Sequence, residues 1–190
     1  MNSYYTDDEL KKFKFIRVGK SVLISRKASI YGEEGVSIGN NVRIDDFCIL
    51  SGKICIGDNI HIAAYSALYG GSEGIYIGNY ANISSRVAIY ALSDDYSGKS
   101  LTSPVIPEQF KHVQRKAVHI GKHVIIGTGS TVLPGVILGE GAAIGAMSLV
   151  KYDLEGWNIY AGNPILKIKE RKRDILDLEM SFENWYNPCK

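Results

Sequence analysis

The stretch from Ile120 to Val150, IGKHVIIGTGSTVLPGVILGEGAAIGAMSLV, decides the fold. Every sixth residue in it is aliphatic, and glycine follows at four of these six places. A helix would place apolar residues every three to four positions, and a half-buried strand would alternate every two. A period of six indicates short strands joined by tight turns, which is the hexapeptide form of the parallel β-helix.

The same register runs through the rest of the chain in groups of three aliphatic positions. Three positions per group predict an all-β, three-sided prism of about six coils, with an ordinary β-sandwich as the alternative. We expect the glycines because the corners need backbone angles that glycine adopts readily. The positions are 18, 24 and 30; 38, 44 and 50; 56, 62 and 68; 77, 83 and 89; 120, 126 and 132; 138, 144 and 150.

Three insertions interrupt the register, and each follows the third position of its group. They add two residues after Ile30, three after Leu68 and twenty-five after Ile89. All three should therefore leave the prism on the same side. A loop of the length of 90–119 in a compact repeat is usually functional, so we expect the chemistry there.

The two ends of the chain are predicted to be helical. Thr6 and Glu9 form a capping-box pattern that opens a short helix through about Phe15. Apolar spacing over 166–186 predicts an amphipathic helix that covers the last coil. The expected organisation is an N-terminal cap over 1–17, the β-helix over 18–155, and a closing segment with its helix over 156–190.

Composition and charge exclude several classes of protein. The net charge is +2 and no long basic block occurs, so nucleic acid is not the expected partner. No apolar run is long enough to span a membrane, and the polar, acidic start is unlike a secretion signal. The three cysteines, Cys48, Cys55 and Cys189, have no metal-site spacing and favour a reducing compartment. We expect a cytoplasmic protein.

The hexads, the long insertion and the tail AGNPILK at 161–167 together resemble the hexapeptide-repeat acyltransferases over roughly residues 18–170. The resemblance is greatest to the maltose/galactoside O-acetyltransferases and the bacterial sugar-nucleotide acetyltransferases. It implies a left-handed β-helix, a homotrimer, and acetyl-CoA bound between neighbouring subunits without a metal. The residues that resemble the family's coenzyme-binding positions are Gly127, Thr128, Gly145, Ala146, Lys151 and Lys167.

One position departs from the O-acetyltransferase pattern. Those enzymes have a catalytic histidine five residues after the last hexad position before the loop, and here that residue is Asp94, followed by Asp95. Acylating a hydroxyl at pH 7 needs a base with a pKa near 7, whereas an amine needs only a proton acceptor such as a carboxylate. The stretch SDDYSG at 93–98 also resembles that of dTDP-4-amino-4,6-dideoxyglucose N-acetyltransferases.

The sequence therefore predicts acetyl transfer from acetyl-CoA to a nucleotide-linked amino sugar for polysaccharide (O-antigen) biosynthesis. Asp94 and Asp95 are the predicted catalytic residues, although either aspartate could simply turn the loop. Alternatives are a sugar O-acetyltransferase of the maltose/galactoside type, a zinc-dependent carbonic anhydrase of this fold, and a non-catalytic β-helix.

Candidate substrate-binding residues follow from the repeat register. His61 and Asn82 occupy equivalent hexad positions one coil apart, with Arg43 one coil below. We expect them to stack on one edge, either as a sugar or diphosphate site or as a solvated column. Tyr65, Tyr69 and Tyr90 should flank the insertion edge, where Tyr65 and Tyr90 could stack on a base or sugar ring. His119 and His123 should face different ways as exposed or loop residues, which argues against an interfacial zinc.

Overall fold

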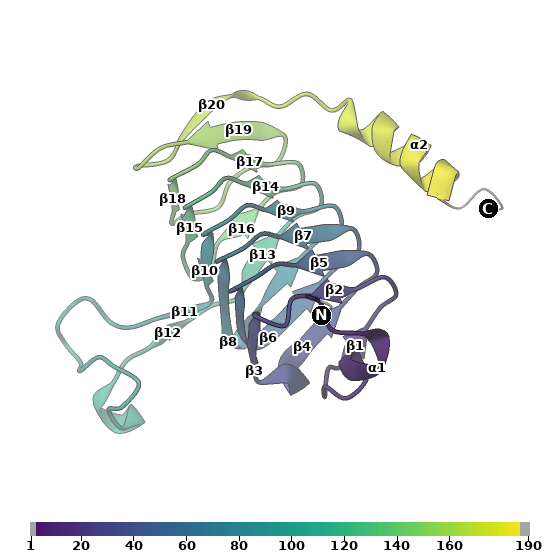
Figure 1. Cartoon of the computed structure of the whole chain (residues 1–190). Helices are drawn as coiled ribbons and strands as arrows, with labels where there is room; N and C mark the ends of the chain where they lie inside the picture. Colours follow the sequence, from purple (N-terminus) through teal and green to yellow (C-terminus); the bar gives the residue numbers. More distant parts are fainter. Residues whose placement is uncertain (1–2, 187–190) are drawn as a thin grey trace.

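Residues 3–186 are described by the computed structural model of the chain, and they form a three-faced parallel β-helix (Figure 1). The predicted architecture is confirmed: strands of successive coils pair in parallel on each face. Leu154 and Tyr160 extend the prism beyond the six predicted coils, because they pair in parallel with Leu138 and Ile144. Cys189 lies outside the described residues.

Each face of the prism contains one aliphatic position from every group of three. The first face contains β1 (Arg17–Val18), β4 (Val36–Ile38), the ends of β6 (Ile49–Ile56) and β8 (Ala67–Ile77), β13 (Val118–Ile120) and β16 (Ile137–Leu138). The second face contains β2 (Leu23–Ile24), β5 (Val42–Ile44), β7 (Ile60–Ile62), β9 (Asn82–Ile83), β14 (Ile125–Ile126), β17 (Ala143–Ile144) and β19 (Asn158–Ala161). The third face contains β3 (Ser29–Tyr31), the starts of β6 and β8, β10 (Ala88–Tyr90), β15 (Thr131–Val132) and β18 (Leu149–Val150).

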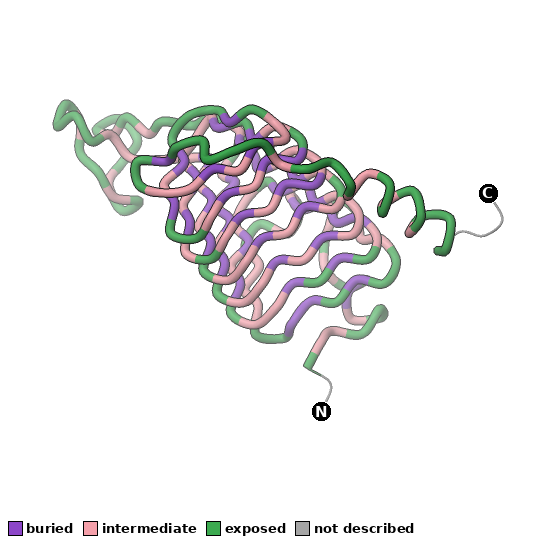
Figure 2. The backbone as a smooth tube through the Cα atoms, turned by 90° about the horizontal axis from the view of Figure 1, so that it is seen from above, coloured by how far each residue is buried: buried purple, intermediate pink, exposed green. Residues whose placement is uncertain are grey.

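The aliphatic hexad positions form the core of the prism. All eighteen are buried except Val18 and Ile30, which belong to the first coil and are half-buried. Figure 2 shows the buried positions recurring along the stacked coils. Burial of an aliphatic side chain contributes about 1.5–3 kcal/mol, so the repeated columns supply the main driving force for this fold.

The glycines of the hexads are needed for a reason other than the one predicted. Those after the aliphatic residue do not adopt positive φ angles; a Cβ on Gly39 would lie 2.5 Å from the Gly57 carbonyl oxygen in the next coil. They permit close stacking of the coils. Positive φ angles occur instead three residues after the buried aliphatic position, mostly at non-glycine residues: Ser21, Asn41, Phe47, Asn59, Tyr65, Tyr80, Arg86, His123, Met147 and Trp157. Backbone hydrogen bonds between coils hold these corners, as from the Tyr80 N–H to the Asp58 carbonyl oxygen.

All three insertions leave the prism at the corner between the third and first faces, as predicted. The first contains a short 3-10 helix, η1 (Glu33–Gly35), and the second lies within β8. The long loop begins with β11 (Leu92–Ser93), which pairs antiparallel with β12 (Gln114–Arg115). Between them lies a second 3-10 helix, η2 (Glu108–Phe110), and the loop projects far from the prism (Figure 1).

The N-terminal helix begins as predicted and ends earlier. Thr6 and Glu9 form the capping box of α1 (Asp7–Leu10), which stops at Leu10 instead of continuing to about Phe15. Phe13 and Phe15 stack on each other with ring centroids 5.0 Å apart and pack on the core. Their two-residue spacing suits an extended segment, which explains the early end of the helix.

The prediction of a helix over 166–186 is wrong for its first half. Leu166–Glu170 form β20, which pairs antiparallel with β19, and only Ile175–Tyr186 form the helix α2. The helix does not cover the last coil. It lies beside the corner between the first and second faces, where Tyr80 donates a hydrogen bond to Glu183.

Candidate active site

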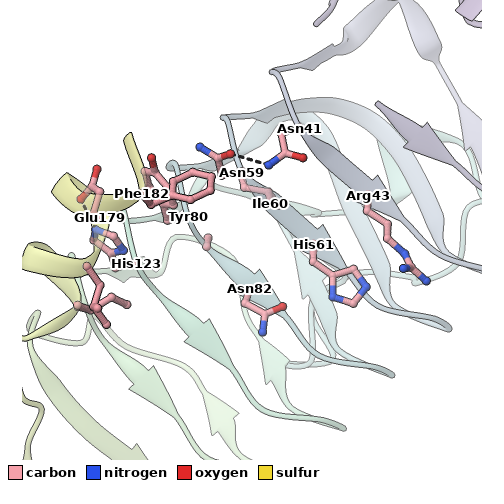
Figure 3. A pocket seen from close by; sticks show the side chains of 13 residues that line it. Asn41, Arg43, Asn59, Ile60, His61, Tyr80, Asn82, His123, Glu179 and Phe182 are labelled. Atoms are coloured by element: carbon pink, nitrogen blue, oxygen red, sulfur yellow. Dashed lines mark hydrogen bonds and ion pairs between the residues drawn. The ribbon is translucent and has the colours of Figure 1, made fainter. Parts of the chain in front are cut away.

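Polar side chains form a column on the outside of the second face. Arg43 pairs with His61 across β5 and β7, and His61 pairs with Asn82 across β7 and β9. The expectation that these side chains stack one coil apart is therefore confirmed, and Figure 3 shows them along successive strands. They line one wall of a surface groove.

Asp45 fixes two members of this column. Its carboxylate lies 2.8 Å from His61 Nε2 and accepts a hydrogen bond of 2.7 Å from Arg43 Nε. Partial burial opposes ionisation, but the hydrogen bonds from His61 and Arg43 hold the pKa of Asp45 below its usual value. A charged carboxylate therefore holds the His61 ring in a fixed orientation within the groove wall.

The helix α2 forms the opposite wall of the groove, whose volume is about 600 Å³. Ile175, Leu178 and Phe182 face the groove from the helix. Two buried polar atoms beside the groove, Asn82 Oδ1 and His123 Nδ1, have no hydrogen-bond partner in the described part of the chain. Together the groove offers hydrogen-bonding groups on the sheet side and an apolar surface on the helix side.

His123 holds the helix in this position, a role that the sequence did not reveal. The expectation that His123 is exposed is wrong, because only 2% of the residue is accessible. Its ring stacks on Tyr80, and its Nε2 lies 2.7 Å from Glu179 on α2. Glu179 also accepts a contact of 2.6 Å from Lys122.

A second cavity, of about 830 Å³, lies at the base of the long loop on the third face. Tyr69 and Tyr90 stack at its wall with ring centroids 5.0 Å apart, and Asp94 also lines it. The structure thus places Tyr90 with Asp94 at the insertion corner. Tyr65 does not flank that corner: it stacks on Phe47 at the corner between the second and third faces.

The two loop aspartates have different surroundings. Asp95 accepts three hydrogen bonds, from the Ser97 N–H and from the hydroxyls of Ser97 and Ser100, and these bonds lower the pKa of its carboxyl. Asp94 accepts one long contact, at 3.5 Å, from the Ser103 N–H. Asp95 therefore shapes the turn, and Asp94 is the one of these two aspartates that lines the cavity.

The predicted coenzyme residues fall into two groups. Gly127 and Gly145 lie at the corner between the second and third faces, where a Cβ on Gly127 would lie 2.5 Å from the Ala146 N atom of the next coil. Thr128 donates a hydrogen bond to the Ser85 carbonyl oxygen. The side chains of Lys151 and Lys167 are exposed near the last coil. Coil stacking accounts for the glycines, while the lysines are available to a ligand.

No group of three or more His, Cys, Asp and Glu side chains in residues 3–186 is arranged to hold a metal ion. His119 lies on the first face, where its ring stacks on Tyr76, whereas His123 lies at the corner that follows this face. The buried thiol of Cys48 has its pKa raised to about 11 by desolvation.

Comparison with known proteins decides the family. Residues 117–151 match the family model described as bacterial transferase hexapeptide (six repeats). An Escherichia coli protein named dTDP-4-amino-4,6-dideoxy-D-glucose acyltransferase is 50% identical over 184 residues, which cover 95% of this chain and 95% of that protein. The chain belongs to the hexapeptide-repeat acyltransferases. As a member of this family it is an acyl-transferring enzyme.

Solved structures of an N-acyltransferase superpose closely on this one. AntD, an N-acyltransferase from Bacillus cereus, was crystallised with dTDP and 3-hydroxybutyryl-CoA; it is 58% identical, with a TM-score of 0.96 over 98% of this chain and all of that chain. Its S84A mutant, in complex with dTDP-4-amino-4,6-dideoxyglucose and coenzyme A, is 58% identical with a TM-score of 0.95, over 97% of this chain and 99% of that chain. A D94A mutant of AntD has also been solved with dTDP and coenzyme A.

Proposed function

We propose that this enzyme transfers an acetyl group from acetyl-CoA to the 4-amino group of dTDP-4-amino-4,6-dideoxyglucose. The observation that carries the proposal is Asp94, a carboxylate with few internal partners in a cavity at the long loop. The relatives add support, because they bind or are named for the same nucleotide-linked amino sugar. The chain also has aspartate and serine at positions 94 and 84, the numbers of the residues substituted in AntD.

The chemistry needs only a proton acceptor from the protein. The unprotonated amine attacks the thioester carbon, and a C–N bond forms in a tetrahedral intermediate. Asp94 takes the excess proton from nitrogen, the C–S bond breaks, and the coenzyme thiolate leaves and is protonated. The products are the amide and free coenzyme A, so atoms and charges balance. Asp95 is the weaker candidate for this role, because its oxygens already accept three hydrogen bonds.

Two half-sites on different faces favour a homotrimer. Asp94 and Tyr90 line the loop cavity on the third face, whereas His61 and Asn82 line the groove on the second face. One chain therefore does not bring these residues together. We assign the sugar nucleotide to the boundary between the loop cavity of one subunit and the groove of its neighbour. Tyr65, at the other corner of the second face, is assigned to the substrate side of this boundary.

The coenzyme is assigned to the corner that carries Thr128 and Ala146, with Lys151 and Lys167 near its phosphates. The ammonium group of lysine is a compact positive charge on a flexible side chain, which suits an anionic ligand. Gly127 and Gly145 contribute closely spaced backbone at the same corner. The predicted division into a cap over 1–17, a β-helix over 18–155 and a closing segment over 156–190 is part of this proposal with one change: the β-helix extends through β19, which pairs in parallel with β17.

Polysaccharide biosynthesis in the cytoplasm is the proposed setting of the reaction. None of the helices within residues 3–186 is long and apolar enough to cross a membrane. The polar groove and the loop cavity suit a water-soluble nucleotide sugar as acceptor.

The deciding experiment compares Asp94→Asn with Asp95→Asn. Both variants are isosteric and lie on the loop, outside the hexad core. We expect Asp94→Asn to lower kcat by about 10²–10⁴-fold, the usual contribution of an acid–base group, with coenzyme affinity unchanged. Asp95→Asn should lower kcat by a much smaller factor. Release of free thiol from acetyl-CoA in the presence of the amino sugar measures both, and near-normal kcat for Asp94→Asn would contradict the assignment.

One observation favours acyl transfer to a hydroxyl as the second candidate. The His61 ring is oriented by the ionised Asp45 at 2.8 Å, and such a histidine–carboxylate pair can act as a base toward a hydroxyl group. If His61→Ala abolishes turnover while Asp94→Asn does not, the O-acetyltransferase function replaces the proposed one.

A further inference from the structure

A buried cation in the loop cavity suggests a site for the diphosphate of a ligand. The side chain of Lys111 is only 6% exposed, although it lies on the long loop. Removing a charged ammonium from water is costly unless a counter-charge accompanies it. The cavity wall therefore contains a buried positive charge that requires a counter-charge.

Glu108 supplies the counter-charge to Lys111 in the structure. Its Oε1 lies 2.9 Å from Lys111 Nζ, and its Oε2 lies 3.2 Å from Arg115 Nη2. One carboxylate thus bridges two cations, with one oxygen on each. Glu108 itself is 70% exposed and sits on the short helix η2, so it reaches the cations from the solvent side.

The surroundings of this bridge match a nucleotide in other respects. The stacked rings of Tyr69 and Tyr90 and the exposed ring of Tyr96 line the same cavity. Arg115 pairs with Leu92 across the antiparallel strands, and Leu92 precedes Asp94 by two residues. Aromatic surface, two cations and an acceptor carboxylate are therefore gathered within one cavity of about 830 Å³.

We propose that Lys111 and Arg115 bind the diphosphate group of a nucleotide ligand, and that Glu108 occupies the phosphate position until the ligand displaces it. A diphosphate offers more oxygens and more negative charge than one carboxylate, so it satisfies both cations better. Glu108 then acts as an internal competitor, which keeps the buried Lys111 neutralised in the free enzyme. The proposal rests on the proposed function for the identity of the nucleotide.

Two diphosphates have the required chemistry, that of the sugar nucleotide and that of coenzyme A. Calorimetric titration with dTDP, thymidine and coenzyme A separates them, because thymidine has no phosphate. The test variants are Glu108→Gln and Lys111→Met. The matched controls are Glu73→Gln and Lys99→Met, which remove equivalent charges from exposed residues that do not line the cavity.

Glu108→Gln should increase the affinity for the diphosphate ligand by about two- to fivefold, the range that exposed ion pairs contribute. Lys111→Met should decrease that affinity by about ten- to hundredfold, because a charge-assisted hydrogen bond is lost. Thymidine affinity should not change in either variant. If the variants change the affinity for dTDP, the site binds the sugar nucleotide. If they change the affinity for coenzyme A, the site binds the coenzyme.

The proposal is overturned if Glu108→Gln binds both dTDP and coenzyme A no more tightly than wild type, since Glu108 would then only brace the loop. It is also overturned if Lys111→Met binds like Lys99→Met. Should Lys111→Met fail to fold by circular dichroism, the exposed Glu108→Gln variant decides alone. Wild-type turnover of the amino sugar is measured in parallel. Its absence would count against the proposed function, whereas turnover with unchanged variant affinities would count only against this site.

Discussion

Removing the charge of Glu179 should release the helix α2 from the prism without unfolding the coils. No residue of α2 is fully buried, so the helix depends on a small number of polar contacts and on ring packing. Glu179 makes two of these contacts, at 2.6 Å to Lys122 and 2.7 Å to His123. Because α2 is one wall of the groove, this perturbation also tests how the groove is built.

The structure sets the size of the effect. The Lys122 side chain is 37% exposed, so its ion pair contributes at most about 1 kcal/mol. The His123 side chain is 1% exposed, and a hydrogen bond from a buried donor to a charged acceptor contributes about 1.5–3 kcal/mol. Glu179→Gln keeps one acceptor oxygen, so the net loss should be about 1–2 kcal/mol. Amide exchange in α2 should then accelerate by about 5–30-fold, since each 1.4 kcal/mol is a factor of ten.

Hydrogen exchange followed by mass spectrometry resolves α2 from the coils, because local opening is measured segment by segment. Glu183→Gln is the control: its amide oxygen can still accept the exposed hydrogen bond from Tyr80, so we expect less than about twofold acceleration. Equal protection of α2 in Glu179→Gln and wild type would refute the reasoning. Equal loss of protection in β9 and α2 would refute it as well, because the helix would then not be an independent unit.

Four further outcomes are expected. The hydrogen bonds from Lys122 and His123 outweigh desolvation and lower the pKa of Glu179 from its usual 4.5; its stabilisation of α2 should be complete above that pH and lost as the pH falls through the lower folded value, as limited proteolysis of the helix would show. Gly121→Ala should cost about 1–3 kcal/mol in denaturant unfolding, since its Cβ would lie 2.7 Å from the Glu140 N atom. His61→Ala should mainly raise KM for the sugar nucleotide in steady-state assays. Iodoacetamide at pH 7 should leave Cys48 unmodified in peptide mapping, because burial raises the pKa of its thiol to about 11.

The fold was predictable because one six-residue period specifies both the buried columns and the corners. The hydrophobic pattern shows where each strand points, and the stacking register follows from it, so Arg43, His61 and Asn82 could be aligned in advance. The reason for the glycines could not be read this way. Whether a position needs an unusual φ angle or a close approach depends on the distance between coils, which the pattern does not contain.

The termini show a second limit of the sequence. Leu166 to Lys169 alternate apolar and charged residues, which suits a strand but is too short a pattern to separate from the helical spacing that follows it. The open edge of β19 provides the backbone partners that favour the strand. His123 was misjudged for the same reason: its burial depends on where α2 returns to the prism. The pairing of Glu108 with Lys111 and Arg115 depends on the fold of the long loop, which has no repeat to reveal it.

The single corner used by all three insertions has a consequence for how this enzyme can diversify. The ladders on either side of the twenty-five-residue insertion keep their register: Ala88 pairs directly with Thr131, and Tyr76 with His119. The scaffold therefore tolerates a change in loop length without a change in its stacking. Exchanging the segment between Tyr90 and Val118 for one of different length or chemistry alters the loop cavity while the prism stays the same, which makes this corner the natural place to graft a new specificity.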